Sequence, residues 1–233
     1  SLPCLIPMSQ IAGRLAVLAS CDPSDRIEDL ESRVDCLARL SDVELAAEQR
    51  EAVLLAARSG ACVVTGGPGT GKTTLIHLLC QLFGQVGKRV QLTAPTGQAA
   101  KRLTQAAGIE ARTIHRLLET RYMGEEEEDR LAGPRFRRNA ENPLDADVLV
   151  VDEVSMADVL LLDSLLAAMR PGARIVLVGD ADQLPPVGPG NALRDILASN
   201  CVPAVRLTRI YRQSEAGRIV ENAHRINRGE YPV

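Results

Sequence analysis

The stretch Gly66–Thr73, GGPGTGKT, limits what this chain can fold into more than any other part of the sequence. It fits the pattern G-x-x-x-x-G-K-[ST] and lies between an apolar run, ACVVTG, and a helix-like segment, TTLIHLLCQLF. Glycines in such a loop let backbone N–H groups curl around phosphate oxygens, and the following helix directs its positive end at the same point. The motif therefore predicts a strand, a phosphate-binding loop and a helix, in that order.

Short runs rich in β-forming residues recur along the chain: ACVVTG, RVQLTA, DVLVVDE, RIVLVGD and PAVRLT. Most of them are apolar throughout, which is typical of strands buried on both faces of a parallel sheet. Intervening segments such as DVLLLDSLLAAM and NALRDILAS have the apolar spacing of crossover helices. We expect an α/β fold, a parallel sheet flanked by helices, preceded by a small helical segment at residues 1–44.

The composition excludes several classes of protein. With 233 residues, 45% hydrophobic and 24% charged, the chain is typical of globular proteins. No apolar run is long enough to span a bilayer and no leader pattern indicates export, so we expect a cytoplasmic protein without a membrane partner. The six cysteines form no CxxC pair and are expected to be reduced, several of them buried. Two Phe, three Tyr and no Trp argue against single-strand binding based mainly on base stacking.

Four of the expected strands end in loops with unusual polar residues: GGPGTGKT, APTGQ, DEVS and GDADQ. Ligands of open parallel sheets bind just outside the carboxyl ends of the strands. Asp152 and Glu153 form one of these ends, where an aspartate can hold Mg²⁺ and a neighbouring glutamate can activate a water molecule. Together with the phosphate loop, this pair predicts nucleotide hydrolysis rather than binding alone.

The stretch VGDADQLPPVGPG, residues 178–190, is a stiff way to leave a strand. Proline rings lock φ and the glycines permit turns that other residues cannot make, so the loop is expected to have one fixed shape. We expect it to hold Gln183 at the carboxyl edge of the sheet. Met156, after DEVS, is expected in the core, and the charged stretch 121–144 is expected to be a mobile surface insertion.

Seven segments in a fixed order resemble the ATPase motor of superfamily-one DNA helicases of the RecD type. They are LAAEQREAV, GGPGTGKT, LTAPTGQAAKRL, ARTIHRLL, VVDEVSMAD, VGDADQLPPVGPG and RIYRQ. The resemblance covers residues 45–233 and implies that they form a P-loop NTPase domain with a RecA-like sheet, the first motor domain of such a helicase.

The resemblance also implies a site for ATP and Mg²⁺. Gln49 matches a glutamine that reads adenine, Gln183 one that senses the γ-phosphate, and Arg212 an arginine that contacts it. The residues expected at the nucleotide are Gln49, Gly67, Pro68, Gly69, Thr70, Gly71, Lys72, Thr73 and Thr74. Thr73 and Asp152 are the expected metal ligands, and Lys72, Glu153, Gln183 and Arg212 the expected catalytic set.

A second group of residues is implied to contact single-stranded DNA. Its members are Pro95, Thr96, Gly97, Thr113 and His115. Gln98 stands where a basic residue is expected in this family, so one phosphate contact is weaker unless Lys101 or Arg102 replaces it.

The implied activity is ATP-driven 5′-to-3′ movement on single-stranded DNA in DNA repair or recombination. Such motors close two RecA-like domains around ATP, and we expect the second domain to be missing from these residues. The 233 residues alone should then bind ATP–Mg²⁺ weakly, hydrolyse it poorly and unwind no duplex. The partners could include subunits of a nuclease complex. Two alternatives stay open: the helicase region of a conjugative relaxase, and a nucleotide-gated binding module that moves no DNA.

Overall fold

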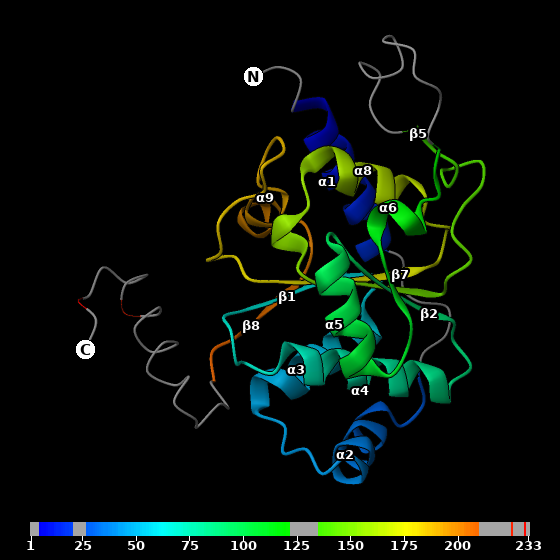
Figure 1. Cartoon of the computed structure of the whole chain (residues 1–233). Helices are drawn as coiled ribbons and strands as arrows, with labels where there is room; N and C mark the ends of the chain where they lie inside the picture. The colour runs from blue at the N-terminus through cyan, green and yellow to red at the C-terminus, as the bar shows by residue number, and fades with distance from the viewer. Residues whose placement is uncertain (1–4, 21–26, 122–134, 210–224, 226–230, 232–233) are drawn as a thin grey trace.

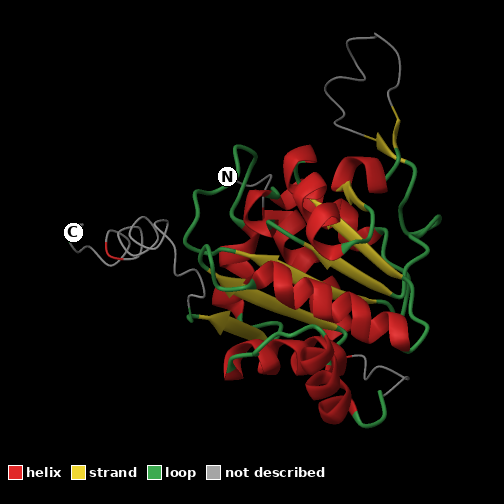
Figure 2. Cartoon of the chain, turned by 60° about the horizontal axis from the view of Figure 1, so that its bottom comes forward, coloured by secondary structure: helices red, strands yellow, loops and turns green. Residues whose placement is uncertain are grey.

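The computed structural model describes residues 5–20, 27–121, 135–209, 225 and 231 (Figure 1). Within these ranges a six-stranded sheet runs through the molecule, with helices on both of its faces (Figure 2). None of the helices in the described ranges combines the length and the apolar character that a membrane crossing requires.

The sheet has the strand order β3-β2-β6-β7-β1-β8, and every neighbouring pair is parallel. Its strands are β1 (Ala61–Gly66), β2 (Val90–Ala94), β3 (Ala111–Thr113), β6 (Val148–Val151), β7 (Arg174–Gly179) and β8 (Ala204–Leu207). Because all strands run the same way, their carboxyl ends meet at one edge of the sheet. The predicted α/β fold with a parallel sheet is confirmed.

The three central strands are buried on both faces, as their apolar sequences predict. In β1, Cys62 and Val64 belong to one hydrophobic core, whereas Ala61 and Val63 belong to the other. This alternation follows from the period of two along a strand, which sends successive side chains to opposite faces. A strand with helices on both sides therefore has apolar residues at most positions.

Two layers of helices provide these cores. The first layer contains α2 (Leu30–Leu40), α3 (Ala47–Arg58), α4 (Lys72–Gln85) and α5 (Gly97–Ala107). The second contains α1 (Leu5–Ser20), α6 (Ile114–Leu117), α8 (Val159–Ala167) and α9 (Ala192–Ser199). Figure 1 shows α1, α8 and α9 above the sheet and α2, α3 and α4 below it.

The first two helices lie on opposite sides of the sheet. Leu15 of α1 is fully buried in the core that α8 shares, and Val34 of α2 is buried against α3 and α4. α1 thus packs on α8 and β1, whereas α2 packs on the helices α3 and α4. The division of the chain into residues 1–44 and 45–233 stays a proposal.

The charged insertion begins and ends in a short two-stranded ribbon. β4 (Thr120–Arg121) pairs antiparallel with β5 (Arg135–Phe136), and residues 122–134 lie outside the described residues. Glu119 accepts a hydrogen bond from the Arg138 guanidinium at 2.7 Å, so an ion pair closes the base of the ribbon.

Candidate nucleotide site

The phosphate loop leaves the buried strand β1 and ends where α4 begins at Lys72. Gly69 and Gly71 have φ of 80° and 84°, in the left-handed region where glycine is strongly favoured. Gly66 is required for a different reason, because a Cβ there would lie 2.8 Å from Thr70 Oγ1 and 2.9 Å from the Leu207 carbonyl oxygen. The glycines of the motif thus set both the turn and its close fit against β8.

Lys72 lies over the loop that precedes it. Its ammonium group donates hydrogen bonds to the carbonyl oxygens of Gly66 at 2.6 Å and Gly67 at 2.9 Å. Thr70 closes the turn from the other side, because its hydroxyl donates to the Gly67 carbonyl at 2.9 Å. The charge of Lys72 is therefore placed at the loop whose N–H groups can bind phosphate.

Gln49 is a buried residue of α3 that contacts the phosphate loop directly. Its side-chain N–H donates to the Thr70 carbonyl at 3.0 Å, and its side-chain carbonyl accepts from the Ala46 N–H at 3.1 Å. A buried amide must satisfy its polar atoms, and Gln49 does so by fixing the first turn of α3 to the loop. Its expected contact with adenine stays a prediction.

The acidic pair, Asp152 and Glu153, follows β6, which one strand, β7, separates from β1 in the sheet. Burial, and after it the charge of Glu153, raises the pKa of Asp152 to about 6, while the nearby Lys72 acts in the opposite direction. Glu153 has a φ of 52°, an uncommon conformation for a residue with a side chain. Its Oε2 atom is buried and has no hydrogen-bond partner. Strain and an unpaired polar atom are features that cluster at functional sites.

The residues present fit a magnesium ion. Asp152 is a largely buried carboxylate within electrostatic reach of Lys72, and Thr73 is an exposed hydroxyl residue in the first turn of α4. Hard oxygen ligands of this kind, few in number, suit Mg²⁺ when phosphate supplies the others. Groups of three or more His, Cys, Asp or Glu that could hold a metal are absent from the described part of the chain, which is compatible with such a shared site.

The proline-rich loop after β7 is held by close packing. A Cβ on Gly188 would lie 2.2 Å from Asp158 Oδ2, and one on Gly190 would lie 2.4 Å from Val159 Cγ2. At its start, the Ala181 N–H donates to Thr65 Oγ1 at 3.2 Å, which ties the loop to the end of β1. The fixed shape expected from the sequence thus has a direct structural cause.

Gln183 lies at the carboxyl edge of the sheet, where the loop meets the turn after the acidic pair. Its side-chain carbonyl accepts a hydrogen bond from the Ser155 hydroxyl at 3.4 Å. Ser155 belongs to the short helix η2 (Val154–Met156). Because β6, β7 and β1 are neighbours, the acidic pair, the Gln183 loop and the phosphate loop lie at one edge of the sheet.

The expected DNA-contacting residues lie further along the same edge, at the ends of β2 and β3. Thr96 caps α5 by accepting from the Ala99 N–H at 3.2 Å, and Thr113 caps α6 by accepting from the Arg116 N–H at 3.2 Å. His115 is exposed, with its ring 6.0 Å from that of Phe136. The two caps are structural roles, and DNA contact by these residues stays a prediction.

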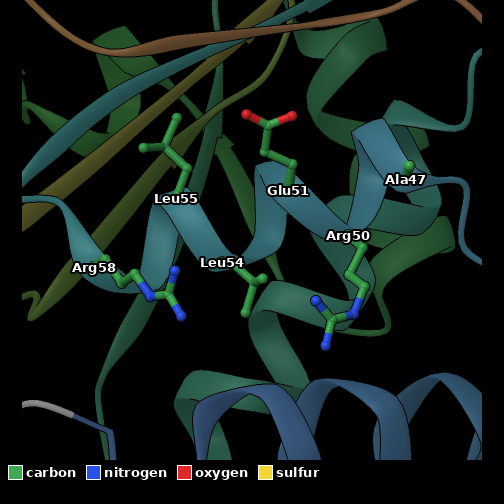
Figure 3. A pocket seen from close by; sticks show the side chains of 6 residues that line it. All are labelled: Ala47, Arg50, Glu51, Leu54, Leu55 and Arg58. Carbon is green, nitrogen blue, oxygen red and sulfur yellow. The ribbon is translucent and has the colours of Figure 1, made fainter.

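A separate pocket of about 370 Å³ runs along α3 and is lined by Ala47, Arg50, Glu51, Leu54, Leu55 and Arg58. Figure 3 shows Arg50 and Arg58 extending toward α2, and Glu51 and Leu55 on the other side of α3. Both arginines are engaged by acids of α2: Arg50 pairs with Asp35, and Arg58 with Glu31. Residues of the phosphate loop do not line this pocket, so it is not the expected nucleotide site.

Residues 44–232 match the family model described as AAA domain. The chain belongs to this AAA domain family. The ATP-dependent RecD2 DNA helicase of Deinococcus radiodurans is 39% identical over 224 residues, which are 96% of this chain and 29% of that protein. The RecBCD enzyme subunit RecD of Mycolicibacterium smegmatis is 43% identical over 64% of this chain and 30% of its own length. These relatives confirm the resemblance to RecD-type proteins, and the chain spans less than a third of the length of either.

Solved structures agree with the fold. The Pif1 protein of Bacteroides, bound to single-stranded DNA, matches with a TM-score of 0.54 and 28% identity, over 82% of this chain and 47% of that chain. The Pif1 helicase of Candida albicans matches with a TM-score of 0.54 and 26% identity, over 82% and 45%. The RecA-like P-loop architecture of this AAA domain is therefore shown.

Three further predictions for this AAA domain concern Met156, the cysteines and Arg212. Met156 was expected in the core and this is wrong, because its side chain is 45% exposed at the end of η2. Cys62 and Cys80 are buried, which raises the pKa of their thiols to about 12 and 11, whereas Cys36 is exposed. Arg212 lies outside the described residues.

Sequence patterns did not single out Thr65, Ser155 or Glu48. Each makes its contact through a hydrogen bond to a residue far away in the chain: Ala181, Gln183 and Thr208 respectively. A hydroxyl residue at the end of a strand and an acid next to Gln49 are common features, so they carry little signal before the fold is known.

Proposed function

We propose that the chain is the first motor domain of a RecD-type DNA helicase, which couples ATP hydrolysis to 5′-to-3′ movement on single-stranded DNA in DNA repair or recombination. The observation that carries this proposal is the buried, unpartnered Oε2 of Glu153, which lies at the same sheet edge as the phosphate loop. A carboxylate oxygen left without a donor in a folded protein is suited to accept a proton from an attacking water.

The proposed reaction uses the geometry of the loop. Backbone N–H groups of Gly67 and of residues 69–72, together with the Lys72 ammonium, hold the phosphates of ATP, while Glu153 orients and deprotonates the attacking water. Thr73 and Asp152 would hold Mg²⁺, which supplies positive charge to the phosphate oxygens when bound. Gln183, in the loop packed against Asp158, senses the terminal phosphate, and Arg212 adds a second positive charge there.

The DNA track of this proposal follows the ends of β2 and β3. Thr96, just after β2, and Thr113, the last residue of the neighbouring strand β3, are the N-caps of α5 and α6, and backbone N–H groups at helix N-termini favour phosphate. The exposed His115, Lys101 and Arg102 lie on the helices that begin at these points. Nucleic-acid affinity based on such phosphate contacts is independent of sequence and sensitive to salt.

We also propose the type of protein to which this domain belongs, its further domain and its location in the cell. The chain matches the Deinococcus RecD2 over 96% of its residues but the mycobacterial RecD over 64%, which favours a RecD2-like protein over a subunit of a RecBCD-like nuclease complex. We propose that a second RecA-like domain outside these residues completes the ATP site, and that the protein acts in the cytoplasm.

The decisive experiment measures ATP hydrolysis by the full-length protein with and without single-stranded DNA. We expect strong stimulation by DNA, abolished in the Lys72→Ala and Glu153→Gln variants. A hydrolysis rate indifferent to DNA would overturn the motor and favour a nucleotide-gated binding module. Forked duplexes with either a 5′ or a 3′ tail test direction, and unwinding from the 3′ tail alone contradicts the proposed polarity. Robust unwinding by residues 1–233 alone would contradict the need for a second domain.

A further inference from the structure

The carboxylate of Glu48 holds the chain at the point where it leaves β8. One carboxylate oxygen accepts the backbone N–H of Thr208 at 2.6 Å and the other accepts the Thr208 hydroxyl. Two donors of Thr208 thus converge on one side chain from a segment 160 residues away in the sequence.

These contacts hold the charged form of the side chain. The Thr208 hydroxyl, and after it the Thr208 and Arg209 N–H groups, keeps the pKa of Glu48 below its ordinary value. Glu48 also lies in the first turn of α3, where the helix dipole favours a negative charge. A surface carboxylate without a fixed partner would show neither the convergence nor the pKa shift.

The same turn of α3 reaches the phosphate loop through the next residue. Gln49 is buried and donates to the Thr70 carbonyl, as described above. The turn is therefore bonded to the loop on one side and to the exit of β8 on the other. A second contact joins these two segments directly, because Gly66 has no side chain and lies against Leu207.

We propose that Glu48 is a positioning residue of the nucleotide site, which clamps Thr208 and thereby holds Gln49 against the phosphate loop. The clamp acts through Gln49 and touches no nucleotide itself. This role rests on the proposed function, since it assumes that nucleotide binds at the phosphate loop.

The test measures the affinity of the 233-residue chain for a fluorescent ATP analogue with Mg²⁺. We expect Glu48→Ala and Thr208→Val each to raise the Kd about fivefold, a modest effect in keeping with a partly exposed clamp. Thr208→Ser keeps the hydroxyl and should bind within about twofold of the unaltered chain. Glu51→Ala, one turn further along the outer face of α3, is the matched control and should also stay within about twofold.

Two double variants separate positioning from a general loss of stability. Because both partners belong to one clamp, Glu48→Ala with Thr208→Val should bind no more weakly than either single variant. In a Gln49→Ala background, Glu48→Ala should cause no further loss. If Glu48→Ala raises the Kd in the Gln49→Ala background by the same factor as in the unaltered chain, the proposal is overturned. Unchanged binding by Glu48→Ala alone would also overturn it. If Glu48→Ala does not fold, Glu48→Gln replaces it, and the same outcomes decide.

The failure of the proposed function has a different signature. If the unaltered chain binds the analogue no better than Lys72→Ala does, nucleotide does not bind at the phosphate loop, and both proposals fall. If Lys72→Ala abolishes binding but Glu48→Ala leaves it unchanged, only the clamp falls.

Discussion

The Ser155 hydroxyl donates a hydrogen bond to the Gln183 side-chain carbonyl, with 3.4 Å between the two oxygens. Ser155 comes two residues after Glu153, and Gln183 lies in the proline-rich loop after the neighbouring strand. The contact therefore links the acidic pair to the loop. We therefore expect a change that shifts Gln183 to affect the turn that follows Glu153.

Replacing Gln183 by alanine should separate binding from turnover. Gln183 is exposed, so Gln183→Ala should leave the fold and the nucleotide affinity unchanged within about twofold. The loss of its link to Ser155 should reduce DNA-stimulated ATP hydrolysis by the full-length protein about tenfold, which corresponds to about 1.4 kcal/mol in the barrier. Asp182→Ala, which breaks a surface ion pair with Arg206, is the neighbouring control. Unchanged turnover by Gln183→Ala would contradict a role of the loop in hydrolysis and leave it a structural role alone.

The central sheet was predictable because its strands are buried on both faces. The runs at β1, β6 and β7 are apolar at nearly every position, with the buried Thr65 and Arg174 as exceptions, and such a run is visible without knowing which strands lie beside it. The edge strand β3 gave no such signal: its three residues are exposed or half-buried. An edge strand lacks a neighbour on one side and needs fewer apolar residues, so its sequence resembles that of a loop.

The site was predictable where function requires a special backbone. Gly69 and Gly71 take left-handed backbone conformations, and this requirement is visible in the sequence as the glycines of the motif. Contacts between distant segments produce no comparable sequence motif. The bond between Glu48 and Thr208 depends on β8 lying beside β1, which no pattern within α3 can indicate. The outward direction of Met156 likewise depends on the packing of η2 and not on its apolar character.

Adding one methyl group to the proline-rich loop should destabilise the protein. In Gly188→Ala, the new Cβ would lie 2.2 Å from Oδ2 and 2.6 Å from Cβ of Asp158, so the backbone must move. We expect a loss of about 2 kcal/mol in the free energy of unfolding, measured with urea. Gly84→Ala is the matched control, because that glycine lies in α4 with open space around it. It should stabilise by about 0.5–1 kcal/mol. Equal stability of the two variants would contradict this account of the loop.

The buried carboxyl of Asp152 should make stability fall as the pH rises. Burial raises its pKa from 3.8 to about 6. The folded state therefore keeps a proton between pH 4 and 6 that the unfolded state has released, and stability decreases through this window. Relative to Asp152→Asn, the unaltered chain should lose about 2 kcal/mol between pH 4 and 7.5 in urea unfolding without nucleotide or metal. The difference between the two proteins cancels groups that titrate in both. Parallel pH profiles would show that Asp152 is solvated.

The cations of α5 should replace the contact that Gln98 does not supply. Lys101 and Arg102 are exposed on α5, the helix that Thr96 caps at the edge of the sheet. We expect Lys101→Ala with Arg102→Ala to weaken binding of the full-length protein to single-stranded DNA and to lower the slope of log K against log salt by about 1.4, since each single-strand phosphate contact contributes about 0.7. Arg194→Ala, an exposed cation of α9, should leave the slope unchanged. A double variant with the original slope would exclude both residues from the DNA track and leave the position of Gln98 without a substitute cation.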